Sequence, residues 1–506
     1  MAGIGFELRR MLSHDSYSSL LKGFLYSTVI SAGPWLMSVL SLAFLGIYSV
    51  AFLGFEERQT FSSTVVYIYA GSLVGTGLLQ IIITRYLADH LYQGRRQILG
   101  QCFIPVQLVT AAIQLPVATA VLWSAPLPPA YKATATVGFL LVSMVWQSMI
   151  FISSSRDYLT IVLAFLLGAC CSVGGGLLWG HAHGLVGFLN GFILGQAVIL
   201  ALLMLKVTRQ YGLFGRWDWG FLGYARRYPQ LVGIGLFYNL SIWVDKVVFG
   251  LSEYGRLSAE RFPTYNQYDS SMFLAFTTVV PAMGIFLARS ETDFADAYKA
   301  YYDDIFFRRP LDKILESKDV MTGVMFRSLL DLCKVQGIIT FLMVYFADDI
   351  LQMVGLTYSQ TSMFRFGLLG AFMQILMMFI HVYLLYFDLR RSVLALTFWF
   401  LAINSALAVY TSNLGFAYFG GGFAVACLAG LVASVVVLYW RVSKLEFITF
   451  AQRRILGQSW SRPWHRARRG GQYGRYRDPD AAREEFRAAK RAKGGRGPDQ
   501  GRAASG

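Results

Sequence analysis

The sequence has few charged residues and few cysteines, and both shortages limit what the chain can be. Asp, Glu, Lys and Arg make up only 15% of its 506 residues, whereas 55% are hydrophobic. This is too little charge for a soluble domain of that size. The five cysteines show no CxxC spacing and no ligand spacing with histidine. The pattern therefore predicts neither disulfides nor a zinc site.

The sequence also lacks the local motifs of several enzyme classes. It contains no glycine-rich phosphate loop, no HExxH and no GxSxG, which hold phosphate, zinc or a serine nucleophile in the families that use them. His181 and His183 flank a short turn and could chelate a metal, but we interpret them as exposed turn residues. We expect no catalytic activity, no cofactor and no metal.

Long apolar stretches dominate what is present. A bilayer core of about 30 Å requires roughly 20 apolar residues in a helix, and about twelve stretches of this chain reach that length. They run over residues 20–51, 61–84, 101–124, 133–154, 158–180, 184–205, 231–250, 267–288, 328–351, 366–387, 392–412 and 415–440. We predict an all-α polytopic membrane protein with about twelve transmembrane helices.

The positive charges are distributed unevenly along the chain. The segment from residue 441 onward carries 17 Lys and Arg against 6 Asp and Glu. In the rest of the chain, alternate links between the apolar stretches hold 21 Lys and Arg on one side and 5 on the other. Because basic loops stay in the cytoplasm, this bias predicts that both termini are cytoplasmic. It also favours contact of the tail with anionic lipid over binding of nucleic acid.

The spacing of the stretches divides the chain into two sets of six. We expect an amphipathic cytoplasmic segment, a first six-helix bundle, an inter-bundle linker, a second six-helix bundle and a basic, largely disordered cytoplasmic tail. Their residues are 1–19, 20–205, 206–230, 231–440 and 441–506. Within the second bundle, residues 289–327 form a cytoplasmic loop. The loop is either one or two amphipathic helices interrupted at Pro310 or a solvated linker.

Polar residues cluster in the seventh apolar stretch. Tyr238, Ser241 and Asp245 share one helical face, and Asn239 and Lys246 share another about 100° away. Ionisable groups are costly inside a bilayer, so this sector should face the bundle interior or a watery cavity. Because the two charged neighbours do not point at each other, each should contact another helix or water. Lys246 could alternatively extend to the membrane surface.

Three further polar or aromatic residues within the apolar stretches are compatible with a transport path: Trp35, Gln374 and His381. A histidine can titrate near neutral pH and couple transport to protons. A buried histidine that is satisfied by a hydrogen bond within the bundle is the alternative, and such interhelical bonds are common in membrane proteins.

Two helix breakers are candidate hinges. Gly33 and Pro34 lie in the first apolar stretch, and Pro281 lies in the eighth. Breaks of this kind persist in membrane helices where they line a cavity or allow bending. We expect the helices to be interrupted at both places.

Four stretches of this sequence stand out as motifs: Met1-Ala-Gly-Ile-Gly-Phe-Glu-Leu-Arg9, Ile30-Ser-Ala-Gly-Pro-Trp35, Tyr238-Asn-Leu-Ser-Ile-Trp-Val-Asp-Lys246 and Leu384-Leu-Tyr-Phe-Asp-Leu-Arg-Arg391. They resemble the PelG family of inner-membrane transporters of Pel exopolysaccharide systems. The similarity extends from residue 1 to about 450. It implies the multidrug/oligosaccharidyl-lipid/polysaccharide exporter (MOP) superfamily and a MATE- or flippase-like fold, with two six-helix bundles around a central cavity.

The resemblance also implies a substrate and partners. The substrate would be a polymer rich in N-acetylgalactosamine that is exported to the periplasm for the biofilm matrix. The partners would be the synthase components PelD, PelE and PelF. Since such a polymer crosses nearly neutral, Asp245 and Lys246 would serve gating, structure or ion coupling. The alternatives are a flippase for lipid-linked oligosaccharides or drugs, and a non-conducting scaffold for a polysaccharide synthase.

Overall fold

The computed structural model describes residues 17–154, 157–212, 217–258, 262–289 and 293–452. Within these ranges, eleven helices are long and apolar enough to cross a membrane, which confirms the predicted all-α membrane fold. Residues 17–444 belong to one compact unit, and the described residues 445–452 belong to another. The predictions for most of segment 1–19 and for the tail beyond residue 452 lie outside the described residues.

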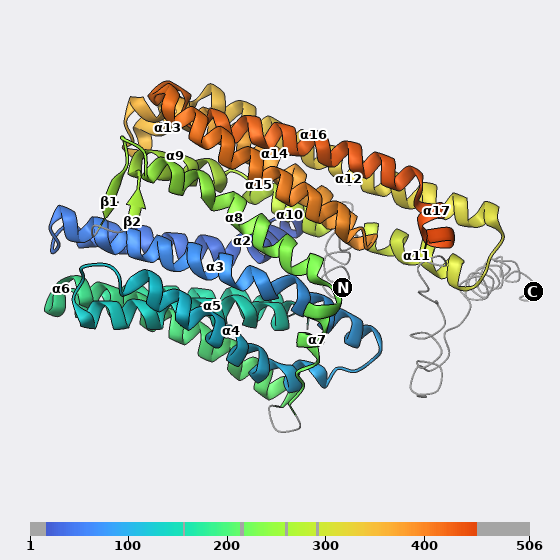
Figure 1. The fold of residues 1–506 in the computed structure, drawn as a ribbon, viewed down its shortest axis with the longest axis horizontal. Coiled ribbons are helices and arrows are strands. Elements are labelled where there is room, and N and C mark those ends of the chain that lie inside the picture. The colour runs from blue at the N-terminus through green and yellow to red at the C-terminus, as the bar shows by residue number, and fades with distance from the viewer. Residues whose placement is uncertain (1–16, 155–156, 213–216, 259–261, 290–292, 453–506) are drawn as a thin grey trace, which may run out of the picture. The chain divides into compact units, whose positions relative to one another are not determined.

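The first bundle comprises five helices, drawn in blue to green in Figure 1. They are α2 (Tyr17–Ser49), α3 (Phe55–Tyr92), α4 (Ile98–Leu122), α5 (Pro129–Ser154) and α6 (Tyr158–Tyr211). Although α6 has 54 residues, it bends sharply at Gly184, whose φ of 54° and ψ of −132° are not helical. Its two arms then pack closely, since a Cβ on Gly175 would lie 3.0 Å from the Cα of Gly191. Therefore α6 supplies two of the predicted spans.

The short helix α7 (Gly220–Arg227) connects the two bundles. The second bundle begins with α8 (Pro229–Gly250), a hairpin of β1 (Arg256–Ser258) and β2 (Phe262–Thr264), and the two short helices α9 (Asn266–Thr277) and α10 (Val280–Arg289). It continues with α11 (Ala295–Phe306), α12 (Leu311–Tyr345), α13 (Ala347–Val354), the 3-10 turn Tyr358–Gln360, α14 (Thr361–Tyr386), α15 (Arg390–Leu414), the 3-10 turn Phe416–Tyr418 and α16 (Gly421–Ser443). These helices run from green to orange in Figure 1.

Each bundle has its own apolar interior. In the first bundle, side chains such as Phe103, Phe151 and Leu203 pack together with almost no exposure, and Phe188 and Phe192 centre a second cluster. In the second bundle, buried aromatic and sulfur-containing side chains from α8, α9, α14, α15 and α16 form one such cluster. The bundles meet where α3 packs on α8 and where α2 packs on α10.

The predicted helix interruptions are half right. The eighth stretch is divided into α9 and α10, and the break falls at residues 278–279, just before Val280 and Pro281 at the start of α10. In contrast, α2 continues through Gly33 and Pro34, so the predicted interruption there is wrong. A proline costs a helix one backbone hydrogen bond, and tertiary packing can compensate for that loss.

The loop predicted over residues 289–327 is mostly helical. Its first part is α11, and Pro310 is the N-cap of α12. The second part is continuous with the next membrane span, because α12 is a single helix from Leu311 to Tyr345. At 1.5 Å per residue its 35 residues extend over about 50 Å, which is longer than a bilayer core. In the second compact unit, α17 (Leu445–Phe447) is followed by a π-helical turn (Ile448–Gln452).

Candidate functional site

Asp245 forms a charged cluster in the interior of the second bundle. Its side chain is fully buried, and its Oδ2 accepts a hydrogen bond of 2.6 Å from the hydroxyl of Tyr268 on α9. The ammonium group of Lys246 lies 3.3 Å from its Oδ1. A carboxylate taken out of water requires such partners, because an unpaired buried charge is very costly. The cluster therefore joins α8 to α9.

Lys246 turns back toward its neighbour in sequence, so the prediction that Asp245 and Lys246 do not point at each other is wrong. The flexible Lys246 side chain overcomes the 100° between adjacent helical positions, and its Nζ also donates to the carbonyl of Ile242 at 2.9 Å. The same ammonium lies 5.6 Å from the ring centre of Phe276 and 6.0 Å from that of Phe423. Such cation–π contacts keep the charge inside the bundle.

The other predicted residues of α8 divide between two environments. Ser241 is buried within the second bundle, where its carbonyl oxygen accepts a 2.8 Å hydrogen bond from the amide of Asn404, and its hydroxyl donates to the carbonyl of Tyr238. Asn239 instead lies at the crossing of α8 with α3. A Cβ placed on Gly77 would be 2.5 Å from the Asn239 Nδ2 and 2.7 Å from the carbonyl oxygen of Gly235. Asn239 thus contacts the first bundle.

Gln374 and His381 both lie on α14 and are buried within the second bundle. The Nε2 of His381 is 3.0 Å from the hydroxyl of Ser434 on α16, as the alternative of a hydrogen-bonded core histidine requires. The side chain of Trp35 lies outside the described set. Among the described residues, the predicted set therefore does not converge on one site between the bundles.

Two contacts tie the β-hairpin to the first bundle. The hydroxyl of Tyr67 on α3 donates a 2.6 Å hydrogen bond to the carbonyl of Pro263, and Phe262 is buried in an apolar cluster of the first bundle. Both lie toward the N-terminal end of α3, away from Arg85. The hairpin of the second half therefore holds the two bundles together at this end.

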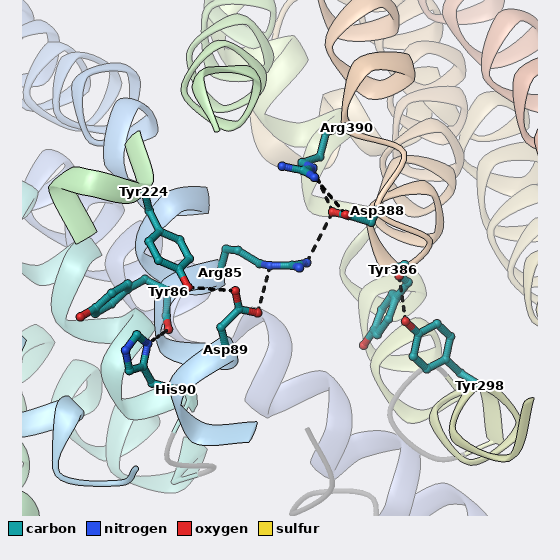
Figure 2. Close-up of polar contacts among 9 residues, drawn as sticks. All are labelled: Arg85, Tyr86, Asp89, His90, Tyr224, Tyr298, Tyr386, Asp388 and Arg390. Carbon is teal, nitrogen blue, oxygen red and sulfur yellow. Dashed lines mark hydrogen bonds and ion pairs between the residues drawn. The ribbon is translucent and has the colours of Figure 1, made fainter. Parts of the chain in front are cut away.

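A chain of charged and aromatic side chains crosses between the bundles at the opposite end, as Figure 2 shows. Arg85 on α3 contacts Asp89 one turn later, with Nε 3.1 Å from Oδ1. Its Nη1 also lies 3.6 Å from Oδ1 of Asp388, which follows α14. Asp388 is held in turn by Arg390, whose Nε is 2.9 Å from the same oxygen. The two carboxylates and two guanidinium groups together are neutral.

The linker helix α7 contacts this chain of charges. Phe221 is buried in the core of the first bundle, and the hydroxyl of Tyr224 donates to Oδ2 of Asp89 at 3.2 Å. Burial, together with the negative charge of Asp89, raises the pKa of Tyr224 to about 12. Tyr228, which ends α7, lies under the guanidinium of Arg390 at 4.3 Å. The linker therefore contacts charged groups from both bundles.

The sequence reasoning missed the contact between Arg85 and Asp388. In the sequence, Arg85 is one of many basic residues in the links between apolar stretches, and Asp388 lies within the stretch Leu384–Arg391. Asp388 has a positive φ of 61°, which is uncommon for a residue other than glycine. An acidic residue followed by two arginines between two apolar stretches was the available signal, but it did not identify the partner.

Comparison with known proteins agrees with this architecture. The family model of PelG exopolysaccharide exporters (EPS-E) matches residues 1–450. No curated protein matches the sequence.

Solved structures of MOP superfamily transporters are similar to the chain in fold. One is a transporter from Pyrococcus furiosus Vc1 (DSM3638), with 14% identity and a TM-score of 0.60 over 84% of this chain and 96% of that one. Another is a MATE family multidrug resistance transporter in an outward-facing conformation, with 13% identity and a TM-score of 0.61 over 88% and 99% of the two chains. At these identities the similarity shows the fold alone.

Proposed function

The chain belongs to the PelG exopolysaccharide exporter family, and from that premise we propose that it exports a Pel-like polysaccharide across the bacterial inner membrane. It is a multi-pass membrane protein with a MATE-like transporter fold, which suits transport rather than catalysis. The polymer is rich in N-acetylgalactosamine, and the synthase components PelD, PelE and PelF deliver it from the cytoplasm. Both termini lie in the cytoplasm, where the basic tail contacts anionic lipid.

One observation carries this proposal: the bundles touch through separable contacts. Midway along the interface, glycines replace side chains where α3 crosses α8, as at Gly77 and Gly235. At one end the contacts include the β-hairpin, at the other they include the pair of Arg85 and Asp388, and α2 packs separately on α10. Each bundle keeps its own apolar interior. The interface can therefore open at one end while it stays closed at the other, as alternating access requires.

The cluster at Asp245 acts within the second bundle. Its charges are satisfied by Tyr268 and by each other, so it fixes the position of α8 against α9 while the bundle moves as a body. Pro281, at the start of α10, serves as a hinge between α9 and α10. A neutral polymer then passes along α8, where the amide of Asn239 and the ring of Tyr238, on neighbouring faces of the helix, can contact sugar rings. Gln374 and His381, which are buried on α14, contribute polar groups to the interior of the same bundle.

Reconstitution tests the proposed export. The full chain is placed in vesicles together with the synthase components, labelled sugar nucleotide is supplied outside, and polymer protected from an added glycoside hydrolase is measured. Export predicts protected polymer that depends on this protein. Polymer that forms in its presence but stays fully digestible would select the scaffold. Accumulation of a lipid-linked glycan in a strain lacking the protein would select the flippase.

A further inference from the structure

The contact between Arg85 and Asp388 is built so that it can be broken without leaving a charge alone. Arg85 has a shorter contact within its own bundle, to Asp89 at 3.1 Å, than across the interface at 3.6 Å. Asp388 likewise has a shorter contact of 2.9 Å to Arg390 in its own bundle. Figure 2 shows Arg85 directed between the two carboxylates. If the bundles separate here, each group keeps its nearer partner.

This arrangement differs from the buried cluster at Asp245. The side chain of Asp245 has no exposure, whereas those of Arg85 and Asp388 are 39% and 21% exposed. Partly solvated ion pairs contribute little free energy, and the separated charges can be hydrated. Breaking a fully buried pair instead leaves an uncompensated charge. The ion pair between Arg85 and Asp388 can therefore break and form again repeatedly, whereas the buried cluster at Asp245 is suited to stay intact.

The surroundings hold both partners in place while the contact itself stays weak. Asp388 lies in a short turn with a positive φ, and Tyr298 on α11 donates a 3.0 Å hydrogen bond to the carbonyl of Tyr386, two residues earlier. On the other side, Tyr224 on α7 holds Asp89. A non-glycine residue with positive φ persists only where its surroundings stabilise it. The turn is thus positioned to present its carboxylate to Arg85.

Because Arg85 lies far from the crossing of α3 with α8, a small movement at the crossing displaces it more. Arg85 lies eight residues beyond Gly77, where α3 crosses α8, which is about 12 Å along the helix. A small rotation of α3 relative to α8 about this crossing therefore moves Arg85 away from Asp388. Arg85 and Asp388 lie at the end of the bundles that the charge distribution assigns to the cytoplasm.

We propose that Arg85 and Asp388 form a releasable latch that closes the cytoplasmic end of the interface between the bundles, and that polymer can enter the transport path only when this latch opens. The inference rests on the proposed export function. It assigns the control of access at the cytoplasmic side to one ion pair. When that pair opens, Arg85 stays paired with Asp89 and Asp388 stays paired with Arg390.

Labelling of a single cysteine tests the latch without any polymer. Ile81 lies one helical turn from both Gly77 and Arg85, on the same face of α3. Ile81→Cys is introduced into the full chain after its five native cysteines have been replaced. Inverted membrane vesicles expose the cytoplasmic side to a membrane-impermeant maleimide, and the labelling rate is measured. Asp388→Asn should raise this rate by up to about fivefold, the range of a partly exposed ion pair.

Arg85→Gln should have the same effect, and the double variant Arg85→Gln/Asp388→Asn should not exceed the single variants, because all three lose the same interaction. The matched control is Arg365→Gln, which removes a 3.1 Å ion pair to Asp348 within the second bundle and should leave labelling of Ile81→Cys unchanged. Additive effects of the two latch variants, or an unchanged rate in both, would overturn the latch.

The labelling result and the export result are independent. Faster labelling with no protected polymer in the reconstituted system would keep the latch as a contact between the bundles and reject both export and the role of the latch in polymer entry. Protected polymer with unaltered labelling would keep export and reject the latch. Unaltered labelling in a variant that elutes from size-exclusion chromatography as the unsubstituted protein does counts against the latch, since misfolding is then excluded.

Discussion

Substitution of Gly77 by alanine should separate the bundles at their crossing. The added Cβ would lie 2.7 Å from the carbonyl oxygen of Gly235, and ordinary contacts begin at 3.4 Å. The backbones must therefore move apart by about 0.7 Å, because the atom in the way belongs to the main chain and cannot rotate aside. Overpacking of this kind costs about 1–3 kcal/mol, which outweighs the gain of roughly 1 kcal/mol that alanine brings to an ordinary helix position.

The assay combines thermal stability in detergent with secretion of polymer by a complemented strain. Gly77→Ala should lower the melting temperature and reduce secretion at equal protein levels. The matched control is Gly174→Ala on α6, where an added Cβ meets no atom within 4 Å, and this variant should be as stable as the parent or slightly more so. Unchanged stability and secretion in Gly77→Ala would refute the close crossing of α3 and α8.

Three further variants test other parts of the structure. Lys246→Met should destabilise the protein by about 3–5 kcal/mol, because it leaves Asp245 charged and buried. In chemical denaturation, the double variant Lys246→Met/Asp245→Asn should recover part of that loss. A double variant less stable than Lys246→Met would contradict the pairing. Tyr67→Phe removes the hydrogen bond to the β-hairpin and should cost about 0.5–1.5 kcal/mol; equal protease resistance of the hairpin in variant and parent would argue against this anchor. At Asp157, burial acts to raise the pKa, but hydrogen bonds from Lys206 and Thr160 lower it overall. This carboxylate therefore contributes stability above its unfolded pKa of about 3.9. The contribution is lost as the pH falls through the pKa of Asp157 in the folded protein. Asp157→Asn should therefore flatten the acid limb of a curve of stability against pH.

Much of the fold could be predicted because the bilayer restricts the solutions. Apolar stretches of spanning length indicated the helices. The turn near Gly184 separated two of these spans, although both belong to the single 54-residue element α6. The interruption near Pro281 followed from the same reasoning. The uninterrupted path of α2 through Pro34 could not be predicted, since local propensity does not reveal whether neighbouring helices compensate for a missing hydrogen bond.

The site was only partly accessible to such reasoning. The cost of a charge in a bilayer correctly indicated that Asp245 lies inside a bundle. It did not indicate which helix supplies its partner, and Tyr268 stands 23 residues away. Helical periodicity also misplaced Lys246, because periodicity describes the direction of the Cα–Cβ bond and a lysine side chain extends several bonds beyond it.

The sequence by itself determined the membrane class, the positions of the spans and the family, since these depend on local hydrophobicity and on motifs that are continuous in the chain. Only the tertiary structure decided that Phe262 enters the first bundle, that Gly77 meets Gly235 and that Arg85 meets Asp388. The last two contacts join residues more than 150 positions apart. Their partners are selected by the packing of whole helices, and no local pattern contains that information.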